Sequence, residues 1–231
     1  MSWRPVIEGL REAARLIATG DREVVEITLR SIQTASFATL LATLIGLPLG
    51  VAIGMRDFRG KRFVKIFFNG LVGIPTVTLG LLLWILFSRS GPLGFMGLLC
   101  TVPGIAIGEA VLILPIIVSF VVSAIEAKDV QLRDLVRTLG ASEFETSVAI
   151  LREAYAGVSL AIVSGFNRAF AELGIAMMLG LNIKGLTRVL TTTIALQKDM
   201  GDIGLSFALS FILLLVVMSL NIVMGLLRRE D

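Results

Sequence analysis

The polar and apolar positions of the first twenty residues repeat with the period of an α-helix. Glu8, Arg11, Glu12 and Arg15 fall on one face. The apolar residues on the other face are Val6, Ile7, Leu10, Ala13, Ala14 and Ile17. This pattern predicts an amphipathic helix within residues 1–22 that lies at a membrane surface and does not span it. We expect Gly20 to end this helix and Asp21 to cap the next one.

Longer apolar stretches follow, and each is long enough to cross the roughly 30 Å hydrocarbon core of a bilayer, which takes about 20 residues. The predicted spans are Ile32–Met55, Ile66–Phe87, Ile105–Ile125, Tyr155–Leu181 and Ile203–Leu227. Pro75 is expected to kink the second span. Pro103 and Gly104 are expected to interrupt the stretch that leads into the third span. The sequence therefore predicts an all-α polytopic membrane protein, with residues 1–231 forming a single transmembrane domain of about five helices.

Composition agrees with this interpretation and excludes several classes of function. Of the 231 residues, 55% are hydrophobic and 17% are charged, and the mean hydropathy is +0.89, which leaves no room for a separate soluble domain. The chain has no histidine and a single cysteine, Cys100, so imidazole or thiolate metal sites, disulfides and Ser/His catalysis are not expected. The net charge of +3 gives no basic stripe for nucleic acid. We expect no enzyme activity, no metal and no cofactor.

The distribution of basic residues sets the expected orientation. The loop from Arg56 to Lys65 contains five basic residues and one acid, which is typical of a cytoplasmic loop. The N-terminus is then outside and residues 126–153 form a second, longer cytoplasmic loop. The difference in basic residues between the two sides is small, because the N-terminal segment also holds five arginines, although five acids balance them.

Two spans carry small residues at every fourth position, which lets another helix approach closely. The first set is Gly46, Gly50 and Gly54, and the second is Ala161, Gly165 and Ala169. We expect the second set to lie at a subunit interface.

The long cytoplasmic loop contains signals for two short helices with a break between them. Gly140 can take the left-handed conformation that ends a helix, and Ser142 with Glu145 forms a capping box that begins the next. Leu139, Ala141 and Phe144 would be apolar groups near this bend that need a partner to cover them. The alternative is a solvated loop between two spans.

The spacing of Asp134, Leu135, Val136, Gly140 and Ile150 resembles the cytoplasmic loop signature of ABC importer permeases. Asp134 stands where that family usually has glutamate, and Leu135 and Val136 stand where it has alanines. The resemblance implies that this loop contains a coupling helix that fits a groove of a separate cytoplasmic ATPase. The residues expected to couple to the ATPase are Asp134, Leu139, Gly140, Ala141, Ser142, Phe144 and Glu145.

Further segments are similar to the tungstate importer permeases, relatives of the molybdate and sulfate permeases. These segments are Ile17–Asp21, Gly46–Gly50, Ser88–Gly94, Leu139–Ser142, Asn182–Gly185 and Thr187–Thr193. The resemblance implies import of a small oxyanion by alternating access across a prokaryotic cytoplasmic membrane, with an external substrate-binding protein. Molybdate and sulfate remain alternative substrates. A homodimer is expected, because one chain offers one coupling loop whereas an ABC ATPase works as a pair.

Charged residues within a span should face protein or water, because a charge facing lipid costs several kcal/mol. Arg168 and Glu172 lie one helical turn apart in the fourth span. One interpretation is a polar pathway in which Arg168 attracts an oxyanion, while Glu172 and Asn167 modify the electrostatic field around Arg168. The other is a mutual ion pair that stabilises the bundle. Glu109, an acid in the third span, is assigned to structure or gating.

The predicted outer loop is rich in hydrogen-bond donors suited to a tetrahedral oxyanion. Its candidate pathway residues are Asn182, Thr187, Arg188, Thr191 and Thr192, with Lys184 and Thr193 nearby. The alternative is that the threonines cap a helix and bond to the backbone at the membrane edge.

Other classes of protein fit less well. An ion-coupled secondary transporter or channel would usually show internal repeats and more intramembrane titratable groups. A membrane enzyme would need paired acids, a metal cluster or a nucleophile with its base. ATP binding by this chain is not expected, since the nearest glycine-rich segment, Gly54–Lys61, lacks the spacing and the Ser or Thr of a phosphate-binding loop.

Overall fold

The computed structural model describes residues 4–127 and 142–227, and every regular element in these residues is helical. Three helices are long and apolar enough to cross a membrane: α2 (Arg22–Met55), α5 (Val102–Ala127) and α11 (Ile203–Leu227). Two further spans are broken pairs, α3 (Lys61–Val72) with α4 (Thr76–Phe87) and α8 (Tyr155–Phe170) with α9 (Gly174–Gly180). With each pair counted as one span, the predicted five-span all-α architecture is confirmed.

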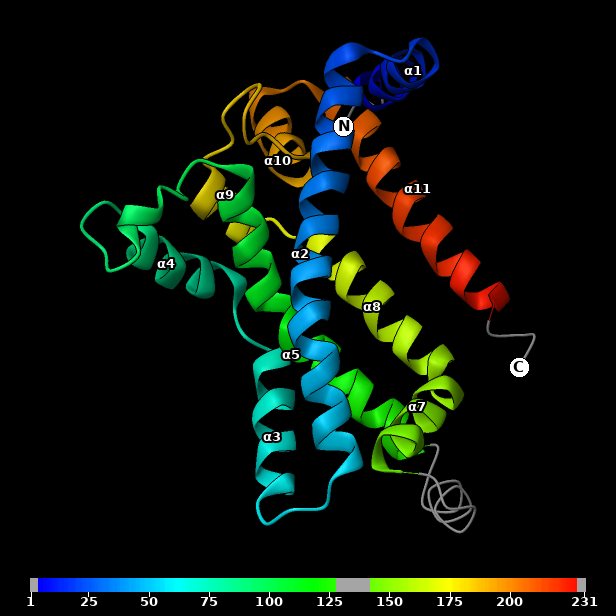
Figure 1. The fold of residues 1–231 in the computed structure, drawn as a ribbon. Helices are drawn as coiled ribbons and strands as arrows, with labels where there is room; N and C mark the ends of the chain where they lie inside the picture. Colours follow the sequence, from blue (N-terminus) through cyan, green and yellow to red (C-terminus); the bar gives the residue numbers. More distant parts are fainter. Residues whose placement is uncertain (1–3, 128–141, 228–231) are drawn as a thin grey trace.

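The centre of the bundle is the contact between α2 and α5 (Figure 1). The predicted glycine face of α2 makes this contact possible. A Cβ at Gly50 would lie 2.7 Å from a methyl carbon of Val121, and Cβ atoms at Gly46 and Gly54 would lie 3.1 Å from Ile117 and Ile125. Each glycine thus accepts one bulky β-branched side chain of α5, and the two helix axes come close together.

Helix α8 covers another face of α5 through its small residues. Ala161 and Ala169 are fully buried, and a Cβ at Gly165 would lie 3.2 Å from Ile117. The expectation that this face forms a subunit interface was therefore wrong, because α5 of the same chain covers it. Ile117 touches both Gly46 and Gly165, so one side chain of α5 fills the space between α2 and α8.

The second span is bent by a much larger angle than a proline kink within one helix would produce. Helices α3 and α4 differ in direction by 96°, and the break lies at Gly73, Ile74 and Pro75. Pro75 is the N-cap residue of α4, where its missing N–H costs nothing. Pro103 behaves similarly, because it lies in the first turn of α5, so the helix begins at Val102, three residues before the predicted start of the span at Ile105, and residues 98–101 lie outside it. A short 3₁₀ turn, η1 (Gly94–Met96), lies between α4 and α5.

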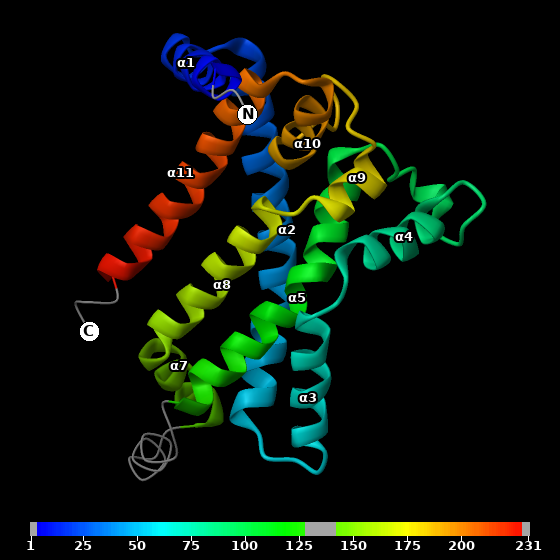
Figure 2. The same cartoon turned by 180° about the vertical axis from the view of Figure 1, so that it is seen from behind.

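The two short outer helices α4 and α9 pack against each other. A Cβ at Gly80 would lie 3.1 Å from Met178, and one at Gly174 would lie 2.8 Å from the hydroxyl of Thr76. Figure 2 shows these two helices side by side, away from α8 and α11. The outer halves of the two broken spans therefore form one contact.

The amphipathic helix is α1 (Arg4–Thr19), which lies across the start of α11 (Figure 1). A Cβ at Gly9 would lie 2.9 Å from Ile203, and one at Gly204 would lie 2.6 Å from Glu12. Asp21 accepts hydrogen bonds from the N–H groups of Glu23 and Val24, as predicted for the cap of the next helix. The apolar residues Ile7, Leu10 and Ile17 remain exposed, which fits a helix that lies against lipid.

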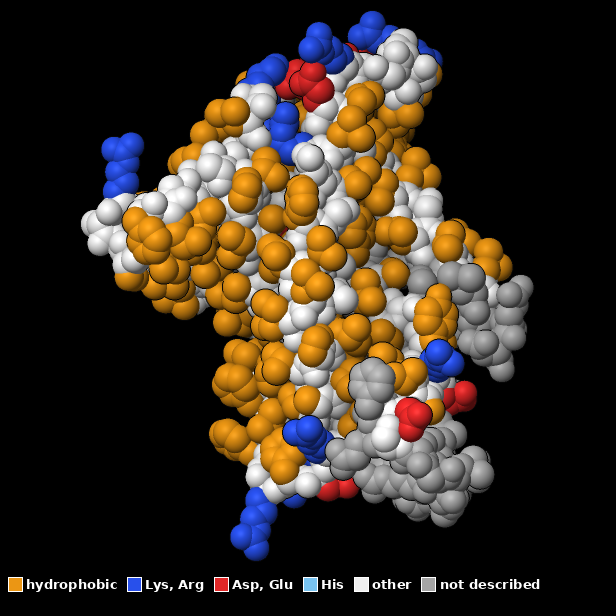
Figure 3. Space-filling view, in the orientation of Figure 1, with side chains coloured by type: hydrophobic (Ala, Val, Ile, Leu, Met, Phe, Trp, Pro, Cys, Tyr) orange, Lys and Arg blue, Asp and Glu red, His pale blue; other side chains and the backbone are white. Residues whose placement is uncertain are grey.

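Charged side chains gather at the two ends of the molecule, and a hydrophobic surface separates them (Figure 3). The turn between α2 and α3 lies at the same end as α7 (Glu143–Glu153), whereas α1 and α10 (Leu190–Met200) lie at the opposite end (Figure 1). This arrangement agrees with the predicted sides of the loops, since the first expected cytoplasmic loop and the described part of the second, α7, are at one end.

Candidate functional site

The predicted pair of charges in the fourth span lies at the break between α8 and α9. The Arg168 guanidinium donates to a carboxylate oxygen of Glu172. The other oxygen of Glu172 accepts the N–H of Ile175 at 3.2 Å, in the first turn of α9. The Glu172 side chain is only 2% exposed, whereas that of Arg168 is 37% exposed. The ion-pair geometry is therefore present, and Arg168 still reaches a more open side of the helix.

A second carboxylate lies close to this pair. Glu109 of α5 is 3% exposed, and one of its oxygens has no hydrogen-bond partner among the described residues. Glu109 interacts electrostatically with Glu172. Gly108, the residue before it, lies against Ile175 and Leu179 of α9. The break between α8 and α9 thus brings two buried acids and one arginine together.

Asn167 connects this region to the last span. Its amide nitrogen lies 3.3 Å from the amide oxygen of Asn221 in α11. The amide oxygen of Asn167 has no partner in the part of the chain that the structure describes. The sequence analysis did not identify Asn221, although it is the single amide side chain within residues 203–227, which carry no charge. A lone amide at membrane depth was the signal that could have identified it.

The hydroxyls of the outer loop bond mainly within the chain. Thr187 donates to the carbonyl of Gly180 and accepts the N–H of Ile183 at 3.0 Å. Thr192 lies 3.0 Å from the side-chain oxygen of Asn182 and accepts the N–H of Val189 at 3.2 Å. Thr187 and Thr192 are fully buried. These contacts are the capping and backbone role that the sequence analysis gave as the alternative to substrate binding.

Thr191 has a different position. Its hydroxyl donates to the backbone carbonyl of Glu172 at 2.7 Å, so α10 is tied to the break between α8 and α9. Nearby, the hydroxyl of Ser31 in α2 accepts the N–H of Leu190 at 2.7 Å. Arg188 belongs to the same loop, where its largely buried side chain pairs with Glu23 of α2. The candidate pathway residues therefore fall into a buried group near the break and a charged group at the outer end.

The coupling region is described only from Ser142 onward. Helix α7 begins with the predicted capping box: the Ser142 hydroxyl accepts the N–H of Glu145, and a Glu145 carboxylate oxygen accepts the N–H of Ser142 at 2.8 Å. These hydrogen bonds, the backbone one first, lower the pKa of Glu145 below its ordinary value. The other predicted coupling residues Asp134, Leu139, Gly140 and Ala141 lie outside the described residues, as does the side chain of Phe144.

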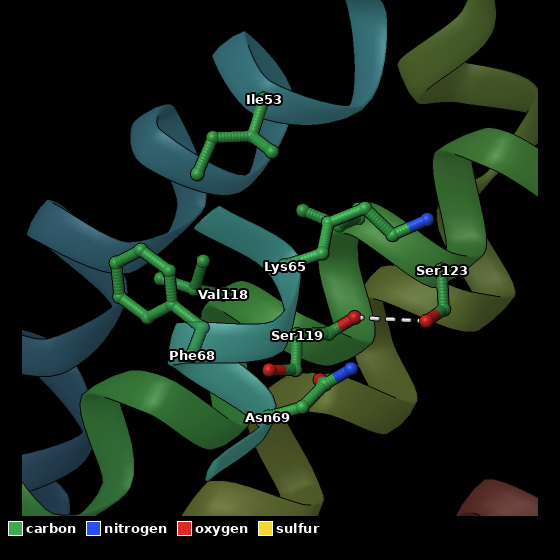
Figure 4. A pocket seen from close by; sticks show the side chains of 8 residues that line it. Ile53, Lys65, Phe68, Asn69, Val118, Ser119 and Ser123 are labelled. Atoms are coloured by element: carbon green, nitrogen blue, oxygen red, sulfur yellow. Dashed lines mark hydrogen bonds between the residues drawn. The ribbon is translucent and has the colours of Figure 1, made fainter. Parts of the chain in front are cut away.

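A small polar pocket lies between α2, α3 and α5 at the inner end (Figure 4). Lys65, Asn69, Ser119 and Ser123 contribute its polar groups, and Lys65 also pairs with Glu126. The volume of about 20 Å³ holds about one water molecule, so this pocket is too small for an oxyanion. Among the described residues, no group of three or more His, Cys, Asp and Glu could hold a metal ion.

Comparison with known proteins decides the family. The sequence profile of the family described as "binding-protein-dependent transport system inner membrane component" matches residues 46–230. The chain belongs to this family.

Members of the family with curated names resemble the chain over nearly its full length. The tungstate uptake system permease protein TupB of Peptoclostridium acidaminophilum is 36% identical, over 97% of this chain and 99% of the relative. A probable anion ABC transporter permease protein of Haloferax volcanii is 34% identical, over 89% of this chain and 92% of the relative. TupB of Campylobacter jejuni is 32% identical, over 97% of this chain and 94% of the relative.

The fold has a counterpart among solved structures. A chain of the MetNI methionine ABC transporter in an inward-facing conformation superposes with a TM-score of 0.72, covering 90% of this chain and 95% of that one. The sequence identity is 19%, so this likeness concerns the fold alone. Family and fold confirm the predicted ABC importer permease of the cytoplasmic membrane. Such a permease works with an ATPase and a substrate-binding protein, and the relatives named above are transport proteins.

Proposed function

We propose that this chain is the permease subunit of an ABC importer for tungstate or a closely similar tetrahedral oxyanion. The observation that carries this proposal is the 36% identity to a tungstate permease along 97% of the chain. A second tungstate permease, at 32% identity, supports it. Molybdate is the next candidate, because the molybdate/tungstate permease protein WtpB of Pyrococcus furiosus is 27% identical over 87% of this chain.

In this proposal residues 1–231 act as one permease domain, two copies of which form a homodimer. Residues 126–153 are the coupling loop of each copy, and Asp134, Leu139, Gly140, Ala141, Ser142, Phe144 and Glu145 contact the ATPase. The capping box at Ser142 supports this assignment, because it gives α7 a defined first turn that begins at Glu143, three positions after Gly140 in the sequence. Hydrolysis of ATP belongs to the partner subunit, and this chain is not itself an enzyme.

The oxyanion would pass near the break between α8 and α9. Arg168 is suited to attract it, because its side chain is more than a third exposed although it pairs with a buried acid. Asn167 and Asn221 add amide groups on the side that faces α11. Asn182, Thr187, Thr191 and Thr192 would hold the outer part of this pathway in shape, since their hydrogen bonds connect α9, α10 and the break.

The test uses the complete complex of permease, ATPase and binding protein in proteoliposomes. Tungstate is expected to stimulate ATP hydrolysis and to accumulate inside the vesicles, with molybdate weaker and sulfate weakest. Stimulation by sulfate alone would show that the substrate is sulfate and not tungstate, whereas the class of transporter would stay the same. Uptake driven by an ion gradient without ATP would instead support a secondary transporter and contradict the proposal.

A further inference from the structure

At the outer end of the molecule, two basic side chains from one loop meet a single carboxylate of α2. Lys184 Nζ lies 2.8 Å from one oxygen of Glu23, and Arg188 Nη1 lies 3.3 Å from the other. Both cations belong to the segment between α9 and α10, whereas Glu23 lies in the first turn of α2. Two cations therefore converge on the single carboxylate of Glu23.

The loop that carries these cations is held in place by a third basic residue. Arg30 of α2 donates to the backbone carbonyl of Arg188 at 3.0 Å and to that of Gly185 at 3.1 Å. Both of these hydrogen bonds go from the Arg30 guanidinium to the backbone, and they hold the loop of Lys184 and Arg188 near the start of α2. The backbone at Gly185 and Arg188 is therefore held by Arg30 independently of the ion pairs with Glu23.

Arg188 has unused capacity to bind an anion. Its side chain is only 12% exposed, and its Nε is buried without a hydrogen-bond partner among the described residues. A guanidinium has five N–H donors arranged to bind two oxygens at once. The contact with Glu23 uses Nη1 and leaves Nε as an unpaired donor among the described residues.

These groups line a cleft of about 450 Å³. A water molecule occupies about 30 Å³ in the liquid, so the cleft has room for a tetrahedral oxyanion with part of its hydration shell. The cleft opens at the end of the molecule where acidic and basic side chains gather next to each other (Figure 3). A doubly charged oxyanion would match the two positive charges of Lys184 and Arg188.

We propose that this cleft receives the oxyanion on the outer side, and that Glu23 acts as a tethered anion that the oxyanion displaces. The proposal rests on the proposed function, because it assigns the first contact of the same substrate with this chain. The Glu23–Lys184 pair costs little to break, since the Lys184 side chain is 69% exposed and exposed ion pairs contribute little stability. The Arg188 side chain is only 12% exposed, so the oxyanion must take the place of Glu23 as its counter-charge. The bound oxyanion would gain charge-assisted hydrogen bonds from both cations.

The cleft connects to the break between α8 and α9 through a short stretch of backbone. Three residues after Arg188, Thr191 donates to the carbonyl of Glu172, whose side chain pairs with Arg168. Arg188 is thus connected to the element that carries Arg168 through the backbone of residues 188–191 and the Thr191 hydrogen bond. This continuity distinguishes the cleft from a patch of surface charge.

Equilibrium dialysis of the assembled permease–ATPase complex against radiolabelled tungstate, without binding protein, tests the proposal. Glu23→Gln removes the competing carboxylate and is expected to tighten tungstate binding about three- to tenfold. Glu26→Gln is the matched control: Glu26 lines the same cleft and carries the same charge, but it pairs with Arg22 of its own helix. This control is expected to change binding less than twofold.

Loss of the cations should have the opposite effect. Lys184→Gln is expected to weaken tungstate binding about tenfold, and because this side chain is largely exposed the variant should fold normally. Equal affinities for Glu23→Gln and Glu26→Gln, or unchanged binding by Lys184→Gln, would overturn the proposal. A change in affinity for the binding protein without a change for free tungstate would assign the cleft to protein docking and would also overturn it.

The two proposals fail in different ways. Absence of oxyanion-stimulated ATP hydrolysis in the wild-type complex with its binding protein contradicts the proposed function. Normal stimulation in the wild type, together with identical tungstate binding by the Glu23 and Glu26 variants, contradicts only the assignment of the cleft.

Discussion

Arg168 and Glu172 form an ion pair across the 57° break between α8 and α9. The pair is asymmetric: Glu172 is buried and also caps α9, whereas Arg168 is partly exposed. Breaking the pair from either side therefore has different consequences. Removing the arginine leaves a buried charge, and removing the acid leaves a cation that can turn toward water.

Arg168→Gln is expected to lower the stability of the permease by about 3 kcal/mol, because it leaves the Glu172 carboxylate buried and unpaired. The double variant Arg168→Gln/Glu172→Gln should recover most of this loss, since no buried charge remains. Thermal unfolding in lipid nanodiscs measures both effects. If Arg168 also serves the substrate, the double variant will be stable yet will not transport oxyanion. Full transport by the double variant would limit the pair to a structural role.

Gly50→Ala should disturb the contact between α2 and α5. The new methyl group would lie 2.7 Å from a carbon of Val121 and 3.2 Å from the carbonyl oxygen of Val118, so the two helices must separate. Overpacking of this kind costs about 1–3 kcal/mol. Gly70→Ala in α3 is the control, because nothing lies within 4 Å of its Cβ position and alanine favours a helix. A lower unfolding temperature for Gly70→Ala than for Gly50→Ala would contradict the packing argument.

The capping box of α7 should depend on pH. Hydrogen bonds from Ser142 lower the pKa of Glu145, so the ionised acid stabilises the first turn of α7 at pH values above its ordinary pKa. This contribution is lost as the pH falls through the lowered pKa of the folded state. Hydrogen exchange of the α7 amides, corrected for intrinsic rates, should show protection that declines only below about pH 4.5. The same decline in Glu145→Gln would contradict this assignment.

Ser142→Ala removes the hydroxyl that accepts the N–H of Glu145 and is expected to cost α7 about 1 kcal/mol of local stability. Ser142→Thr keeps an oxygen at this position and serves as the control. In the assembled complex the alanine variant should show weaker coupling between ATP hydrolysis and uptake, measured as transported oxyanion per ATP. Unchanged coupling, with α7 measurably less protected, would mean that the cap stabilises α7 without contributing to coupling.

The orientation of the chain can be tested by labelling. Replacement of Cys100 by serine leaves no other cysteine in the sequence. A cysteine introduced at Arg59 should react with an impermeant maleimide only from the cytoplasmic side. One introduced at Lys198, an exposed residue of α10, should react only from outside. Labelling of both positions from the same side would contradict the five-span topology.

Local signals in the sequence predicted local structure well. The cap at Asp21, the capping box at Ser142 and the bounds of the last span at Ile203 and Leu227 all agree with the structure. Each depends on residues that are near neighbours in the chain, so no distant contact has to be known. The glycines at 46, 50 and 54 also predicted a close helix contact, but not that α5 would make it.

Features that depend on distant contacts were harder to predict. Pro75 indicated a bend, but neither its size of 96° nor the contact that α4 makes with α9 could be inferred from the sequence near Pro75. The threonines of the outer loop offered hydroxyls, but only the fold shows that Thr187 and Thr192 are buried and bond within the chain. The pairing of Glu23 with Arg188 joins residues 165 positions apart, and no local pattern indicates it.

The contact between α4 and α9 ties together two segments that the sequence places almost a hundred residues apart. Neither Gly80 nor Gly174 can accept even a methyl group without moving the other segment, since Met178 and Thr76 already fill the space. A single substitution at either glycine will therefore deform both interrupted membrane crossings together. A defect that arises in one half of the polypeptide will therefore be transmitted to the other half through this contact.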